Sequence, residues 1–155
     1  MKQPKEKPAN KSDAGHWRVF DHTADAGLMV FGETAEAALT AAGLGLASMI
    51  ADRRRVCAVR RVEFTVTSSA YEELLADWLR ELLYFHETQR FVFRNCGVTD
   101  IQHIGDAFQA VGWGVGEPID AKRHLLHREV KSVTWHQLSL ECGAAGWTGR
   151  VILDI

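Results

Sequence analysis

The stretch GLMVFGETAEAALTAAGLGLASMIAD, residues 27–52, predicts a buried strand followed directly by a helix. Gly27 to Glu33 are almost continuously apolar, which is typical of a strand covered on both faces. Thr34 stands where a helix N-cap is expected. The apolar residues that then recur at helical spacing are Leu39, Ala42, Leu46 and Met49. This order of elements predicts a domain in which a helix packs on a sheet.

A second strand and helix follow the first pair. Residues 60–68, RRVEFTVTS, alternate apolar and polar side chains and predict a half-exposed strand. Residues 70–88, AYEELLADWLRELLYFHET, carry an apolar stripe at helical spacing. Ser69 and Glu72 just before and inside this stretch form a capping-box pattern. The segment therefore predicts an amphipathic helix with one face in the core.

The rest of the chain is mainly β. Segments 91–105 and 107–117 predict a hairpin that turns near Gly105 and Asp106, and residues 147–155, WTGRVILDI, predict a last strand. Residues 17–22, WRVFDH, are a further short strand candidate at the start. We therefore expect an α+β fold: a single domain with two helices packed against a mixed, largely antiparallel β-sheet.

Composition bounds the class of protein. The chain is 46% hydrophobic and 25% charged, which suits one globular domain over residues 16–155. Residues 1–15 are charged, with two prolines and no large apolar residue, and predict a disordered tail. Three scattered cysteines favour reduced thiols in a cytoplasmic protein, and no apolar run approaches a membrane span. The net charge of -2 implies no broad basic surface, although residues 52–61 are locally basic.

Two polar groups point to metal chemistry. The segment FDHTADAG, residues 20–27, carries Asp21, His22, Thr23 and Asp25 between two apolar strands. Oxygen ligands on such a loop suit hard divalent cations, but the same residues also form ordinary turns.

The second group is the end of the chain, where Asp154 is followed by the α-carboxylate of Ile155. If both are partly buried, two charges about 4 Å apart repel by roughly 4 kcal/mol at an effective dielectric constant of 20. A cation, an arginine or lysine, or a protonated carboxyl would relieve that repulsion. If Asp25 converges on the same place, a metal ion is the simplest explanation; a frayed, solvated terminus is the alternative.

A third polar segment, GEPIDAKRHLLHREVKSVTWH, covers residues 116–136. Its histidines do not have the spacing of a zinc site, so each is expected to be a surface or hydrogen-bonded residue. Its cations could face an anion such as a phosphate, or lie on a solvated turn. The chain has no phosphate-binding loop, nucleophile elbow or Rossmann glycine pattern.

Four segments in order resemble the archease family. DHTADAGLMVFGET is similar to its opening H-T-A-D motif, and LLADWLRELLY to its second helix. The segment GEPIDAKRHLLHREVKSVTWHQLSL resembles its G-E-x-x-D-x-x-x-H block, and VILDI its Asp-Ile terminus. The resemblance covers nearly all of the chain after Trp17. One departure is Ala26, where the family has a large aliphatic residue; with Gly27 after it, we expect a loosened strand start.

The resemblance implies a non-catalytic cofactor of the tRNA-splicing RNA ligase, which promotes guanylylation and multiple turnover of that ligase. The chain would contact RNA only indirectly, through the ligase, and it is not expected to bind a membrane. The family binds a divalent cation, reported as Ca²⁺, although Mg²⁺ and Mn²⁺ would suit the same oxygens. The implied ligands are Asp25, Asp154 and Ile155. Polar residues expected to contact the ligase or support the site are His22, Asp120, His124 and Lys131.

Two other functions are compatible with the same residues. A metal-dependent phosphohydrolase would use Asp25, Asp154, His22 and His124 around a catalytic cation. A chaperone-like module for RNA-modifying enzymes would need the cation only for its structure. The basic segment 52–61 could form a partner-facing surface, but the family pattern assigns it no role.

Overall fold

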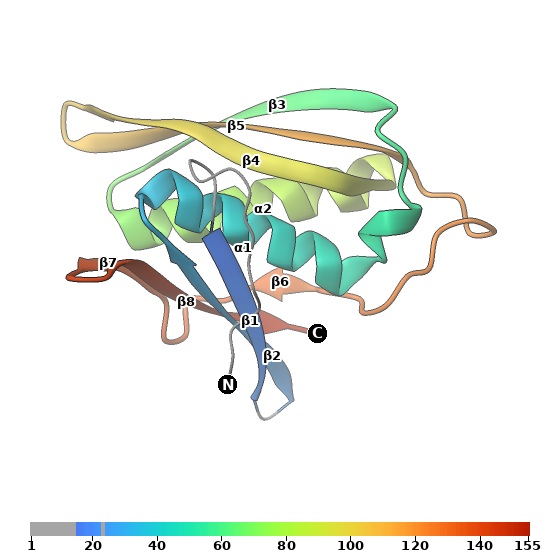
Figure 1. Ribbon diagram of the computed structural model, residues 1–155, viewed down its shortest axis with the longest axis horizontal. Helices are drawn as coiled ribbons and strands as arrows, with labels where there is room; N and C mark the ends of the chain where they lie inside the picture. Colours follow the sequence, from blue (N-terminus) through green and yellow to red (C-terminus); the bar gives the residue numbers. More distant parts are fainter. Residues whose placement is uncertain (1–14, 23) are drawn as a thin grey trace.

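The computed structural model describes residues 15–22 and 24–155, and it places two helices between two β-sheets (Figure 1). One sheet contains, in spatial order, β3 (Arg60–Ser68), β5 (Ala107–Pro118) and β4 (Phe91–Ile104). The other contains β1 (Gly15–His22), β2 (Asp25–Gly32), β8 (Gly146–Asp154) and β6 (Ser132–Val133), and β7 (Ser139–Gly143) also pairs with β8. The helices α1 (Ala35–Ile50) and α2 (Tyr71–Gln89) contact strands of both sheets.

The α+β class with two helices in one domain is confirmed. All strand pairs among the described residues are antiparallel, and they form two sheets where the sequence suggested one. A period of two tells which face of a strand is buried, but it does not tell which strand lies beside it. The predicted tail lies outside the described residues, except for Gly15, which begins β1. None of the described helices is both long and apolar enough to span a membrane.

Helix α1 is buried on nearly all sides, because it lies between the two sheets. This explains its many alanines and glycines, which one apolar stripe would not require. At Gly43 a Cβ atom would lie 2.8 Å from Cys96 Sγ and 3.0 Å from Trp78 Nε1, so a larger residue does not fit there. The predicted N-cap is confirmed: Thr34 Oγ1 accepts a hydrogen bond from the Ala37 N–H at 3.0 Å.

Helix α2 shows the predicted amphipathic pattern, with its apolar stripe in the core. Trp78, fully buried, donates its indole N–H to the Leu39 carbonyl of α1 at 2.8 Å and so joins the two helices. The predicted capping box is wrong, because the N-cap of α2 is Ala70, whose side chain makes no capping hydrogen bond. The Ser69 hydroxyl and N–H donate to Glu73 Oε1 at 2.6 and 3.1 Å, and Glu72 does not take that role.

The C-terminal strand β8 lies inside its sheet, with β2 on one side and β6 and β7 on the other. Val151, Ile152 and Leu153 are almost completely buried. Burial of this kind ties down the end of the chain, so the alternative of a frayed terminus does not hold. The last acid of the chain therefore has a defined place at the edge of the core.

Between β5 and β6, residues 119–131 form a long connection that lies against the end of α1. The Asp52 N–H donates to the Leu125 carbonyl at 2.9 Å, and the His127 N–H donates to the Ile50 carbonyl at 2.8 Å. The Arg128 N–H donates to the Met49 carbonyl at 3.1 Å. The bonds to Ile50 and Met49 satisfy carbonyl groups that a helix C-terminus leaves without an intrahelical partner.

Candidate functional site

Asp25 and Asp154 face each other across the β2–β8 pair. They are direct partners in the antiparallel register, at the first residue of β2 and the last residue of β8. Side chains of directly paired residues project from the same face of a sheet. Both residues are half-buried, and Ile155 follows with its side chain packed against the core. We call Asp25, Asp154 and the terminal carboxylate of Ile155 the acidic tip.

The acidic tip has the donor chemistry that a hard cation requires. The Cβ atoms of directly paired residues lie about 5 Å apart. Two carboxylates at that separation would repel by about 3 kcal/mol at an effective dielectric constant of 20, less where water screens them. Within residues 15–22 and 24–155, no three His, Cys, Asp or Glu side chains gather as a metal-binding group. A cation held here would therefore need oxygen atoms of the main chain or of the chain terminus in addition to Asp25 and Asp154.

Lys131 is brought to the same place by its backbone. Its N–H donates to the Asp154 carbonyl at 2.7 Å, and the next residue, Ser132, is the register partner of Asp154. The Lys131 side chain is exposed. His22 ends β1 as the register partner of Asp25, but its side chain lies outside the described part of the chain. Four predicted site positions, Asp25, Asp154, Ile155 and Lys131, thus lie around the end of β8, and His22 on β1 lies beside Asp25.

The start of β2 is closely packed, contrary to the loosening expected from Ala26 and Gly27. Ala26 is fully buried opposite Leu153. The ring of Phe20 covers Gly27 so closely that a Cβ atom there would lie 2.1 to 2.4 Å from ring carbons. The small residues admit an aromatic ring from β1, and this packing holds Asp25 at the strand start.

Asp120 and His124 belong to a separate cluster, which we call the Glu117 cluster: Glu117, Asp120, Arg123 and His124. His124 Nε2 and Glu117 Oε2 are 2.8 Å apart, and both side chains are buried. Arg123 donates to both carboxylate oxygens of Glu117, at 3.0 and 2.7 Å, and its Nε lies 3.3 Å from Asp120 Oδ2. The cluster fixes the first part of the connection after β5.

The hydrogen bonds assign the protons in this cluster. The Asp120 N–H donates to His124 Nδ1 at 2.8 Å, so the ring proton lies on Nε2 and is donated to Glu117. Glu117 also accepts the Cys57 N–H at 2.7 Å. The Arg123 guanidinium holds the pKa of Glu117 well below its usual range, and Glu117 raises the pKa of Arg123 in turn.

This geometry gives His124 and Asp120 a structural place. The His124 side chain is fully buried and both ring nitrogens are engaged, so its ring presents no surface to a partner. Glu117 and Arg123 carry the cluster, yet the sequence predicted neither as a site residue and indicated only that the cations of segment 116–136 could face an anion. A glutamate at the end of an apolar strand, six residues before an arginine, was the available signal.

Known proteins resemble this chain over most of its length. The sequence profile of the Archease protein family (MTH1598/TM1083) matches residues 17–155. The protein archease of Methanosarcina mazei is 34% identical over 144 residues, which cover 93% of this chain and 99% of the relative. That of Pyrococcus furiosus is 32% identical over 140 residues, covering 90% and 98%.

Two solved structures share the fold. The solution structure of protein 1598 of Methanobacterium thermoautotrophicum has a TM-score of 0.78 and 31% identity, covering 90% of this chain and 98% of its own. The crystal structure of a Thermotoga maritima protein, described as an archease and possible chaperone, has a TM-score of 0.58 and 16% identity. It covers 99% of this chain and 100% of its own, and at that identity it shows the fold alone.

Proposed function

The chain belongs to the archease family, and we propose that it is a non-catalytic cofactor that activates the tRNA-splicing RNA ligase with the help of a divalent cation. The observation that supports this most is the direct pairing of Asp25 with Asp154 at the end of a buried strand. It sets acidic groups at one edge of the protein, where a partner can reach them.

The proposed mechanism is selection of a productive ligase conformation. The acidic tip docks near the nucleotide site of the ligase and favours the arrangement in which its histidine attacks the nucleotide. Nucleotidyl transfer depends mainly on positioning and on neutralising phosphate charge. A cation bound at the tip would offset the repulsion between Asp25 and Asp154 and order the end of β8. Lys131, exposed beside the tip, supplies a positive charge for the partner or its nucleotide.

The test of activation is single-turnover guanylylation of the purified ligase with and without this protein. Asp25→Asn and Asp154→Asn remove charge with little change of shape and should abolish most of the stimulation. Asp106→Asn, on the exposed turn between β4 and β5, is the matched control and should keep it. Equal guanylylation rates with and without the wild-type protein would refute the proposal.

The cation is tested separately by calorimetric titration with Ca²⁺, Mg²⁺ and Mn²⁺. Adding one glycine after Ile155 moves the terminal carboxylate by about 3.5 Å and leaves every side chain in place. We expect this extension to weaken Ca²⁺ binding by at least about tenfold. Binding that is unchanged in both the extended protein and Asp154→Asn would show that the ion does not lie at the acidic tip.

The hydrolase alternative is not favoured by the site. It needs His124 beside the acidic groups, but His124 is buried in the Glu117 cluster with both nitrogens bonded. A chaperone-like role has support from the description of the Thermotoga protein. Pull-downs distinguish a chaperone-like role from specific activation of the ligase. Recovery of many unrelated RNA-modifying enzymes would favour the chaperone-like role, whereas recovery of the ligase alone would favour specific activation.

A further inference from the structure

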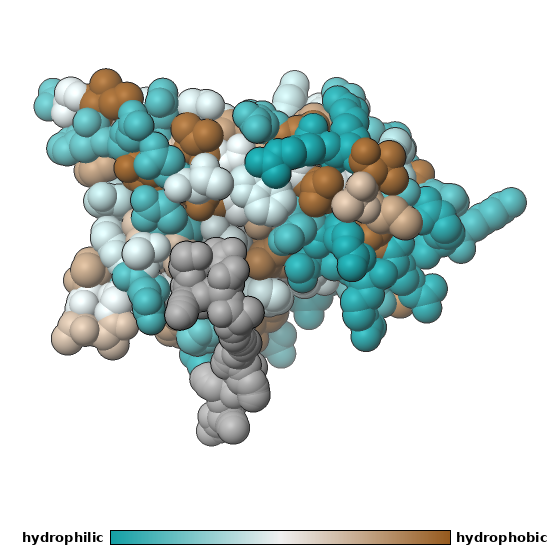
Figure 2. All heavy atoms as spheres, turned by 45° about the horizontal axis from the view of Figure 1, so that its top comes forward, coloured by the Kyte–Doolittle hydropathy of each residue, from teal (hydrophilic) through white to brown (hydrophobic). Residues whose placement is uncertain are grey.

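Four arginines gather at the end of the molecule that carries the 3₁₀ helix η2 (Arg53–Arg55). We call Arg53, Arg54, Arg55 and Arg94 the arginine cluster. Asp52 is the acid that contacts it: Arg54 donates to both its carboxylate oxygens, at 3.0 and 3.1 Å, and Arg55 Nε lies 3.7 Å away. Four guanidinium groups against one carboxylate leave an excess of about three positive charges. Figure 2 shows the same end of the molecule as predominantly hydrophilic.

Arg53 and Arg94 hold each other in place through main-chain oxygens. Arg53 Nε donates to the Arg94 carbonyl at 3.1 Å, and Arg94 Nη1 donates to the carbonyls of Arg53 and Val56 at 3.3 and 2.9 Å. Among the described residues, neither guanidinium has a carboxylate oxygen within 4.0 Å. Burial, with a contribution from the charge of Arg94, lowers the pKa of Arg53. Two like charges fixed side by side are stabilised by an anion between or beside them.

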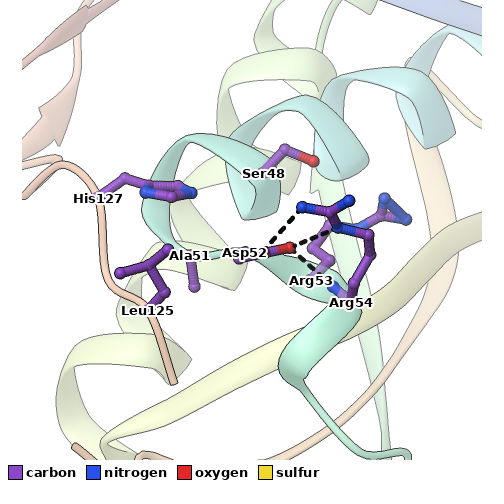
Figure 3. Close-up of a pocket in the computed structure, with 7 residues that line it drawn as sticks. All are labelled: Ser48, Ala51, Asp52, Arg53, Arg54, Leu125 and His127. Atoms are coloured by element: carbon purple, nitrogen blue, oxygen red, sulfur yellow. Dashed lines mark hydrogen bonds and ion pairs between the residues drawn. The ribbon is translucent and has the colours of Figure 1, made fainter. Parts of the chain in front are cut away.

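A hollow of about 370 Å³ lies next to this cluster. Figure 3 shows the Ser48 hydroxyl and the guanidinium groups of Arg53 and Arg54 on one side, with Leu125 and His127 on the other. Asp52 also lines the hollow and accepts hydrogen bonds from Nε and Nη2 of Arg54, while Arg53 donates its Nε to the Arg94 carbonyl. The hollow thus offers the Ser48 hydroxyl and the remaining guanidinium N–H groups of Arg53 and Arg54 as donors. A phosphate group has more acceptor oxygen atoms than a carboxylate and therefore matches that set of donors better.

We propose that the arginine cluster and the adjoining hollow bind the phosphodiester backbone of single-stranded RNA. One phosphate would enter the hollow against Arg53 and Arg54, and neighbouring phosphates would reach the more exposed Arg55 and Arg94. The proposal rests on the proposed function in one respect, since RNA is the substrate of the partner ligase. It adds a direct contact of this chain with RNA, whereas the sequence predicted contact only through the ligase.

The test is a binding titration of the full chain with a fluorescent single-stranded RNA of about 12 nucleotides, in a chelator so that no cation bridges RNA to the acidic tip. If about three phosphates are neutralised, the logarithm of the association constant should fall with the logarithm of the salt concentration at a slope of about -2. The association constant should therefore drop roughly 20-fold between about 50 and 200 mM salt. An excess of inorganic pyrophosphate should compete, and polyglutamate of similar length should compete at least about tenfold less well.

The structure offers a matched pair of variants. Arg55 is 59% exposed and lies 3.7 Å from Asp52; Arg61 is 54% exposed and lies 3.7 Å from Glu63 on β3, outside the cluster. Arg55→Gln should weaken RNA binding about fivefold and reduce the salt slope by about 0.7, and Arg61→Gln should change neither. Arg54→Gln is the second cluster variant, and unfolding midpoints check that each protein is folded.

Three outcomes would overturn the proposal: no RNA binding at 50 mM salt, binding unaffected by both cluster variants, or polyglutamate bound as tightly as RNA. The last result would assign the surface to an acidic protein. Guanylylation of the ligase separates this proposal from the function on which it rests. Asp25→Asn should keep RNA binding while it loses stimulation, and Arg55→Gln should keep stimulation of the guanylylation step, which involves no RNA.

Discussion

Replacing Glu117 by alanine should be among the most damaging single changes outside the apolar core. This carboxylate is 5% exposed and accepts hydrogen bonds from Cys57, Arg123 and His124. It connects the segment before β3 to the connection after β5. Alanine would leave the buried His124 Nε2–H and the Cys57 N–H without their acceptor.

The expected cost follows from those two donors. A buried donor left without an acceptor costs about 1–3 kcal/mol, so the pair predicts a loss of roughly 2–6 kcal/mol in the free energy of unfolding. Arg123 is 47% exposed and can turn to water, so its contribution is left out of that figure. Glu117→Gln keeps one acceptor oxygen but turns an NH₂ group toward other donors, and should lose about 1–2 kcal/mol.

Urea unfolding followed by tryptophan fluorescence measures these losses. The comparison requires that the m-value, the slope of the free energy of unfolding against urea concentration, is unchanged. Glu63→Ala is the matched control, because Glu63 also pairs with an arginine, Arg61 at 3.7 Å, but is 71% exposed. It should change the free energy of unfolding by less than about 1 kcal/mol. Equal losses from Glu117→Ala and Glu63→Ala would refute the reasoning.

The pH dependence gives an independent check on the same carboxylate. Glu117 has a pKa below its ordinary value of 4.5 in the folded protein, first because Arg123 donates to it. A depressed carboxyl pKa adds stability that is fully present above the unfolded-state value and is lost as pH falls toward the folded-state value. The free energy of unfolding should therefore decline below about pH 4.5, by up to roughly 1.4 kcal/mol per pH unit from this group. In Glu117→Gln that decline should be shallower, and an identical profile would contradict the assignment.

Two further predictions concern the cap of α1 and the cysteines. Thr34→Ala removes the acceptor of the Ala37 N–H and should lower the free energy of unfolding by about 1 kcal/mol, measured by urea denaturation; no change would mean that water replaces the cap without loss. Burial raises the pKa of the Cys96 thiol to about 12, whereas Cys57 and Cys142 are exposed. Titration with a thiol reagent should therefore show two fast groups and a third that reacts only on unfolding; three fast groups would contradict the burial of Cys96.

Local signals in the sequence predicted local structure well. The Thr34 cap, the stripe of α2 and the turn at Gly105 (φ 61°) follow from side chains within a few residues of one another. The predicted capping box does not form, because α2 has Ala70 as its N-cap, one residue after Ser69, and Ser69 donates to Glu73 instead of Glu72. Residues 129–142 do not form one continuous strand, because a loop with Gln137 at positive φ (55°) separates β6 from β7.

Pairing across long separations could not be derived in this way. Asp25 and Asp154 each stood out as acids beside apolar strands, but only the β2–β8 register makes them neighbours. Spacing rules apply to residues close together in the sequence and say nothing about groups at opposite ends of a chain. The prediction that these two acids share a site therefore depended on the family resemblance. The Glu117 cluster shows a different case: its residues lie within eight positions in the sequence, but Glu117 also accepts a hydrogen bond from the N–H of Cys57, 60 residues away, which no local pattern reveals.

The connection from residue 119 to residue 131 links all three polar features of the molecule. At its start, Arg123 and His124 bind Glu117. In its middle, backbone groups of residues 125–128 bond to residues 49–52, and Leu125 and His127 line the hollow beside the arginine cluster. At its end, the Lys131 N–H donates to the Asp154 carbonyl. Because this segment has almost no regular secondary structure of its own, these anchors determine its path. The buried glutamate is therefore one of three anchors that together hold one wall of the proposed RNA site and the approach to the acidic tip in a fixed relation to each other.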